Sequence, residues 1–159
     1  MTKPLVVILM GSKADAAHCQ KIAEAAKGFG LDVVTRVGSA HKTPEHVLGI
    51  LREYHADPRP KVYITVAGRS NALSGFVDGA VAEPVIACPP PSDAFGGMDI
   101  LSSLRMPSAI APAVVLDPAN AALFAAKTLG LQDALVREKV CAFQKEQARQ
   151  VLDADDSRE

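Results

Sequence analysis

The strongest constraint on the fold is a regular alternation of short, continuously apolar runs with longer segments of helical spacing. The first run, 5–10, contains no polar residue, which is typical of a parallel strand covered on both faces. We predict further strands at 32–37, 61–66, 85–88 and 113–116. Strands that alternate with helices form βαβ units, so the pattern predicts an α/β protein, a three-layer αβα sandwich around a parallel sheet.

Apolar residues at helical spacing predict the helices that join these strands. The buried stripes are expected to be Cys19, Ile22, Ala23 and Ala26 in a helix that stops at Gly28 and Gly30, and Val47, Ile50, Leu51 and Tyr54 in a helix over 44–55. We also expect a short helix at 77–81, a weak glycine-containing helix within 95–104, and an alanine-rich helix over 118–129. The result is a flavodoxin-like core at 5–131 within a single domain, 1–159.

A last helix, over 133–152, has no following strand. Its apolar stripe of Val136, Val140, Phe143 and Val151 is interrupted once, by Gln147. The stripe packs either on its own sheet or on a second subunit. We favour the second subunit, because exposed apolar stripes usually mark an interface, and therefore expect a homo-oligomer.

The overall charge excludes several classes of partner. A net charge of -1 and a pI near 6.4 give no electrostatic case for binding nucleic acid or an anionic membrane. The N-terminal apolar run is too short for a signal sequence or a membrane span, so we expect a cytoplasmic protein. Three cysteines without paired spacing predict reduced, structural thiols.

Polar loops follow the predicted strands, and the carboxyl ends of parallel strands form the crevice where ligands bind. The loop 38–43 leads into a helix that Thr43 can cap through its hydroxyl and that Pro44 can open. His41 is either a surface residue or an acid-base group, and Lys42 is either a solvated charge or a phosphate ligand at the helix N-terminus. The same two alternatives apply to Arg69. His18, His46 and His55 fall on helices and are expected at the surface.

Two other loops have a structural and a functional interpretation. Gly11, Ser12 and Asp15 form either an ordinary helix cap or a cradle for a phosphate and ribose. The run 89–91 consists of prolines, and is either a rigid turn or an apolar wall for a small, uncharged ligand, because proline donates no hydrogen bond.

Four motifs together resemble the aminoimidazole ribonucleotide carboxylase family of purine biosynthesis. They are the segments 10–15 (MGSKAD), 38–45 (GSAHKTPE), 67–75 (AGRSNALSG) and 88–93 (CPPPSD). The likeness covers about 5–131, in the family's order and spacing.

The third motif separates the family's two branches. In the mutase branch, which rearranges an N-carboxylated ribonucleotide, this loop typically carries a histidine where Ala72 stands here. Lys42 stands where the mutases usually have arginine. Both departures, and the proline motif, resemble the class II branch, which uses carbon dioxide directly and includes the carboxylase half of the animal bifunctional enzyme.

The resemblance implies reversible carboxylation of 5-aminoimidazole ribonucleotide at C4 by carbon dioxide, without metal or other cofactor. His41 would be the catalytic acid-base group, since a free imidazole has a pKa of about 6.5. The implied substrate-binding residues are Gly11, Ser12, Asp15, Ser39, Ala40, Lys42, Gly68, Arg69, Ser70 and Asn71. The carbon dioxide pocket would be closed by Pro89, Pro90, Pro91, Ser92 and Asp93.

Two alternatives remain at this point. The first is the N5-carboxyaminoimidazole ribonucleotide mutase, which has the same fold and a different carboxyl donor. The second is a non-catalytic flavodoxin-like protein that binds a nucleotide. The chain has no Trp and only two Tyr, few aromatic residues with which to sandwich a flavin.

Overall fold

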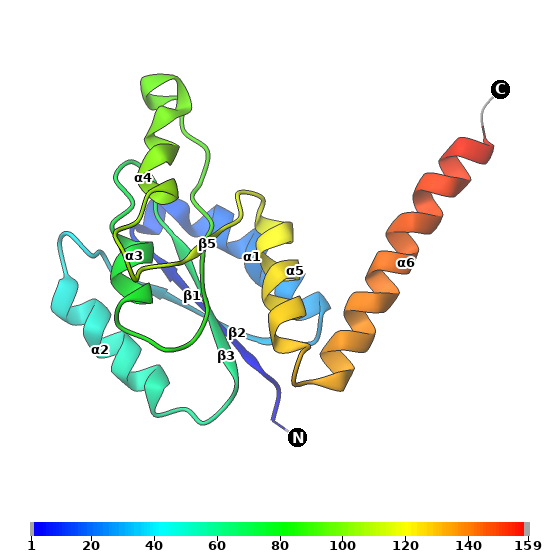
Figure 1. The fold of residues 1–159 in the computed structure, drawn as a ribbon, viewed down its shortest axis with the longest axis horizontal. Coiled ribbons are helices and arrows are strands. Elements are labelled where there is room, and N and C mark those ends of the chain that lie inside the picture. Colours follow the sequence, from blue (N-terminus) through cyan, green and yellow to red (C-terminus); the bar gives the residue numbers. More distant parts are fainter. Residues whose placement is uncertain (1, 158–159) are drawn as a thin grey trace.

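The computed structural model describes residues 2–157 and contains, within them, one all-parallel sheet in the order β2-β1-β3-β4-β5 (Figure 1). The strands are β1 (Leu5–Met10), β2 (Asp32–Val37), β3 (Lys61–Val66), β4 (Val85–Ala87) and β5 (Ala113–Val114). β1 and β3 are buried along their whole lengths. The flavodoxin-like α/β fold predicted from the sequence is confirmed.

Two strands are shorter than predicted. β4 ends at Ala87 instead of Cys88, and β5 ends at Val114 instead of Leu116. The chain after Cys88 consists of prolines, which have no N–H with which to continue a strand ladder. After Val115, Asp117 already caps the next helix by accepting a hydrogen bond from the N–H of Asn120 at 2.8 Å.

Helices cover both faces of the sheet (Figure 1). α1 (Ala16–Gly28) and α5 (Pro118–Leu129) share one apolar cluster with the sheet, and α2 (Pro44–His55) and α3 (Leu73–Asp78) share the other. Both predicted stripes, on α1 and α2, are buried as expected.

The short elements differ from the sequence prediction. The helix expected at 77–81 is α3 and begins at Leu73, within the stretch interpreted as a polar loop. The weak helix expected within 95–104 divides into a 3-10 segment, η2 (Ala94–Ile100), and one α-helical turn, α4 (Leu101–Leu104). Phe95, Gly96 and Gly97 have positive φ angles there, which an α-helix cannot accommodate.

The last helix, α6 (Ala134–Asp156), is longer than the predicted 133–152. Its first turns bury Val136 and Val140 in the chain's own core, and Phe143 meets Phe29 edge to face at 5.4 Å between ring centroids. Beyond that point the helix extends away from the sheet (Figure 1), and Val151 is 70% exposed. The stripe is therefore divided between an intramolecular part and an uncovered part.

Within residues 2–157, no helix combines the length and the apolar character that a membrane crossing requires. Cys19 and Cys88 are buried free thiols, as expected of structural cysteines, whereas Cys141 is exposed on α6.

Gly38 allows β2 and α2 to approach each other closely just before the loop that carries His41. A Cβ atom at position 38 would lie 2.9 Å from Cγ2 of Val47, well inside van der Waals contact. We therefore predict that Gly38→Ala lowers the free energy of unfolding by about 1–3 kcal/mol, the usual cost of overpacking. Chemical denaturation measures this change. In a Val47→Ala background Gly38→Ala should cost less than in the unaltered protein, because the clashing methyl groups are absent there.

Gly49, in the middle of α2, provides the control. A Cβ atom there would have no neighbour within 4 Å, so Gly49→Ala should stabilise the protein by about 0.5–1 kcal/mol through helix propensity alone. Equal effects of the two glycine substitutions would contradict the packing argument.

Candidate active site

The carboxyl ends of the three longest strands lie level with one another. Met10 at the end of β1 pairs with Val37 of β2 and with Val66 of β3. The loops that follow are joined by backbone bonds, from the Gly38 N–H to Met10 O and from the Gly11 N–H to Val66 O, both at 2.9 Å. The predicted convergence of polar loops at one edge of the sheet is thus confirmed.

The turn that carries His41 is closed by its own hydrogen bonds. The Thr43 hydroxyl accepts from the Ser39 N–H at 3.0 Å and donates to the Ser39 carbonyl at 3.3 Å, and the Ser39 hydroxyl accepts from the Lys42 N–H at 3.2 Å. Thr43 occupies the N-cap position of α2, but its side chain bonds no helix N–H. The prediction that the hydroxyl caps α2 was wrong, because the hydroxyl is engaged by the turn. His41 and Lys42 are exposed beside the helix N-terminus.

The first loop, residues 11–15, follows β1 and forms a 3-10 turn, η1 (Lys13–Asp15), before α1 begins. The Ser12 hydroxyl accepts from the Ala14 N–H at 3.2 Å. Burial raises the pKa of the Asp15 carboxyl, while the charges of His18 and Arg69 partly offset that rise. The first and third loops are therefore close enough for their charges to interact.

The third loop, residues 67–72, connects β3 to α3 and contains an unusual backbone conformation at Arg69, with φ at 61°. Asn71, two residues further on, is 4% exposed, and its side chain bonds the Ser103 hydroxyl and the Ser74 N–H. The loop itself is thus held from the interior of the protein, while Arg69 and Ser70 are exposed.

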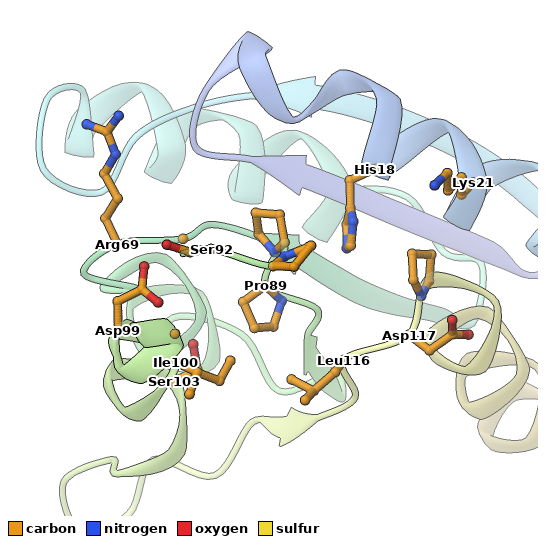
Figure 2. A pocket seen from close by; sticks show the side chains of 15 residues that line it. His18, Lys21, Arg69, Pro89, Ser92, Asp99, Ile100, Ser103, Leu116 and Asp117 are labelled. Atoms are coloured by element: carbon orange, nitrogen blue, oxygen red, sulfur yellow. The ribbon is translucent and has the colours of Figure 1, made fainter. Parts of the chain in front are cut away.

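A cavity of about 550 Å³ lies beside the proline run (Figure 2). Of the predicted site residues, those that line it are Gly68, Arg69, Pro89, Pro90, Pro91 and Ser92. The predicted residues outside this lining are Gly11, Ser12, Asp15, Ser39, Ala40, His41, Lys42, Ser70, Asn71 and Asp93. The structure therefore gathers the proline motif and part of the third loop around one cavity, with the His41 turn and the first loop at the same sheet edge but outside it.

His18 on α1 also lines this cavity, together with Lys21 and Asp117 (Figure 2). The expectation that His18 is a surface residue was wrong: its ring is partly buried, and its Nε2 lies 3.4 Å from Sγ of Cys88. Burial lowers the pKa of His18, and a hydrogen bond at Cys88 and the Asp15 charge offset part of this effect. His46 and His55 are exposed, as expected.

Helical spacing contained the signal for His18. His18 follows Asp15 by three residues and precedes the buried Ile22 by four, so it shares a face with both.

Burial raises the pKa of the neighbouring Cys88 thiol to about 12. Among the side chains of residues 2–157, no three of His, Cys, Asp or Glu are grouped in a way that would hold a metal ion.

Comparisons with known proteins agree with the motifs. The sequence model of the family described as AIR carboxylase matches residues 5–150. The phosphoribosylaminoimidazole carboxylase of Treponema denticola is 56% identical over 153 residues, which are 96% of this chain and 96% of that protein. The phosphoribosylaminoimidazole carboxylase of Archaeoglobus fulgidus is 55% identical over 150 residues, which are 94% of this chain and 82% of that protein.

A solved structure gives the same result in three dimensions. The crystal structure of Treponema denticola PurE superposes with a TM-score of 0.96 at 55% sequence identity, and covers 98% of this chain and 100% of that one. The resemblance inferred from four short motifs is confirmed along nearly the whole chain, and the chain belongs to the AIR carboxylase family.

Proposed function

We propose that this protein carboxylates 5-aminoimidazole ribonucleotide at C4, reversibly and with carbon dioxide as the donor, in purine biosynthesis. The observation that carries the choice of donor is Ala72, which stands where the mutase branch has a second histidine. Two relatives more than 50% identical are named as carboxylases. The apolar wall of prolines beside the cavity is consistent with a small, uncharged co-substrate.

The reaction needs one proton carrier. The electron-rich C4 forms a bond to the carbon of carbon dioxide, and one C=O electron pair moves onto oxygen to give a carboxylate. The C4–H bond then breaks, and its electron pair restores the aromatic ring. We assign the released proton to His41, an imidazole in the turn at the convergent edge of the sheet, and the reverse reaction returns it.

The remaining predicted residues divide by their place in the fold. Ser12, Asp15, Ser39 and Lys42, with the backbone at Gly11 and Ala40, would hold the ribose phosphate where the first two loops meet. The N-terminus of α2 favours an anion there. Gly68, Arg69, Ser70 and Asn71 belong to the loop that would support the base, and the segment 89–93 would enclose carbon dioxide. We assign no metal or other cofactor to the reaction.

A homo-oligomer, tetramer or octamer, located in the cytoplasm is also part of the proposal. Two separate regions support assembly, because both leave large apolar side chains exposed. They are Phe95, Met98 and Leu101 in η2 and α4, and Val151 and Leu152 in α6. We regard the chain as one catalytic domain within each subunit.

The choice of donor is tested by two reactions with the purified protein. One contains aminoimidazole ribonucleotide, bicarbonate and carbonic anhydrase, and the other contains the N5-carboxylated ribonucleotide with free carbon dioxide removed. We expect product in the first reaction only. Efficient turnover in the second, without free carbon dioxide as an intermediate, would identify a mutase. Ligand-induced stabilisation without product in either would instead support the non-catalytic nucleotide-binding protein.

The role of His41 is tested by His41→Asn, which keeps a polar side chain and removes the titratable ring. We expect kcat to fall by about 10²–10⁴-fold, the usual contribution of a general acid-base group. His55→Asn, at the other end of α2, is the control and should retain activity. Full turnover by His41→Asn would eliminate the proposed proton transfer.

The oligomer is tested by analytical ultracentrifugation. We expect the unaltered protein to sediment as a tetramer or octamer, and the variant Val151→Glu to shift towards smaller species, because a charge would enter the uncovered stripe. Ala142→Glu, at an exposed position on the opposite face of α6, should leave the distribution unchanged. A stable monomer of the unaltered protein is the contrary result.

A further inference from the structure

Arg69 has a backbone conformation that a side chain with a Cβ atom rarely adopts. Its φ angle of 61° lies in the left-handed region, where L-residues other than glycine are disfavoured. Arg69 follows Gly68 directly, and both line the cavity. The surrounding structure must therefore maintain this conformation, or the loop at the cavity would relax.

One hydroxyl group holds the backbone on the C-terminal side of the strained residue, on both sides of Ser70. The Ser102 hydroxyl lies 3.1 Å from the Arg69 carbonyl, to which it donates, and accepts from the Asn71 N–H at 3.0 Å. Its proton is shared with the Asp99 carbonyl at 2.8 Å. Ser102 belongs to α4, more than thirty residues further along the chain. The loop is therefore stabilised by an element that is distant in the sequence.

A buried pair reinforces the same connection. The Asn71 amide nitrogen donates to the Ser103 hydroxyl at 2.9 Å, and its amide oxygen accepts from the Ser74 N–H at 3.2 Å. Asn71 is 4% exposed and Ser103 is 1% exposed. Asn71 thus joins the loop to α3 and α4 from the inside, and its side chain is directed away from solvent.

The position of this network places it next to the proposed chemistry. In Figure 2, Arg69, Asp99 and Ser103 lie at one end of the cavity, beside Ser92 of the proline segment. We propose that Ser102 is a positioning residue for the carboxylation, which keeps residues 68–70 in place by stabilising the left-handed conformation of Arg69. The proposal rests on the function proposed above, and it gives Asn71 a supporting role in place of direct contact with substrate.

A double-variant cycle tests whether Ser102 acts through Arg69. We expect Ser102→Ala to lower kcat/KM roughly tenfold, because the left-handed conformation is disfavoured for arginine by about that factor. Glycine adopts this conformation about as readily as its mirror image. In the Arg69→Gly background the same serine substitution should therefore have little further effect. An equal loss in both backgrounds would show that Ser102 does not act through the backbone of Arg69.

Two further variants separate positioning from general stabilisation. Ser102→Thr keeps the hydroxyl and should recover most of the activity lost in Ser102→Ala. Ser108→Ala, an exposed serine beyond α4, is the matched control and should behave as the unaltered protein. Loss of activity in Ser102→Thr equal to that in Ser102→Ala would overturn the role of the hydroxyl.

A crystal structure of Ser102→Ala provides a readout that does not depend on turnover. We expect the φ angle of residue 69 to become negative and the segment 68–70 to shift, whereas an unchanged left-handed Arg69 would overturn the proposal. If the unaltered protein fails to carboxylate aminoimidazole ribonucleotide, the proposed function fails, and this backbone comparison still decides what Ser102 does.

Discussion

The in-register pairing of β1 with its two neighbours is the constraint on which the rest of the structure depends. Because β1 pairs residue by residue with both β2 and β3, the three strands end at the same level. Their loops are then brought within hydrogen-bonding distance, as the bonds from Gly38 to Met10 and from Gly11 to Val66 show. A slip of one strand by a single residue would exchange its two faces and separate these loops. The sheet thus sets the positions from which every site residue starts.

Hydrogen bonds fix the conformations of the loops that the sheet brings together, and the His41 turn and the third loop use different arrangements. The His41 turn is closed by side chains within five residues of each other, Ser39 and Thr43. The third loop depends on Asn71, Ser102 and Ser103, and so on a helix far along the chain. A perturbation of the His41 turn would therefore remain local. A perturbation of α4 would instead reach the cavity, because Ser102 and Ser103 hold the third loop.

The sequence predicted those features that follow from periodicity or from the order of elements. The buried stripes of α1 and α2 were predictable because apolar spacing encodes the face that a helix buries. The start of α3 was missed, although the sequence contained a signal for it. That signal is Asn71, whose side chain accepts a hydrogen bond from the Ser74 N–H, as the side chain of a capping residue does. The left-handed Arg69 was not predictable, because it depends on Ser102, whose proximity only the folded chain creates. His18 is an intermediate case. Helical spacing could predict that it faces the interior, but its contact with Cys88 depends on the folded chain.

The contact between His18 and Cys88 resembles the pair that many enzymes use to generate a sulfur nucleophile, but its surroundings work against that chemistry. Burial raises the pKa of the Cys88 thiol to about 12 and lowers the pKa of the His18 imidazole, so both groups favour their neutral forms at physiological pH. A neutral thiol attacks electrophiles poorly, and carbon dioxide is an electrophile. A sulfur atom placed behind the proline segment therefore does not compete with the substrate carbon for the carboxyl group. The same burial would protect Cys88 from alkylating and oxidising reagents, which would reach the exposed Cys141 first.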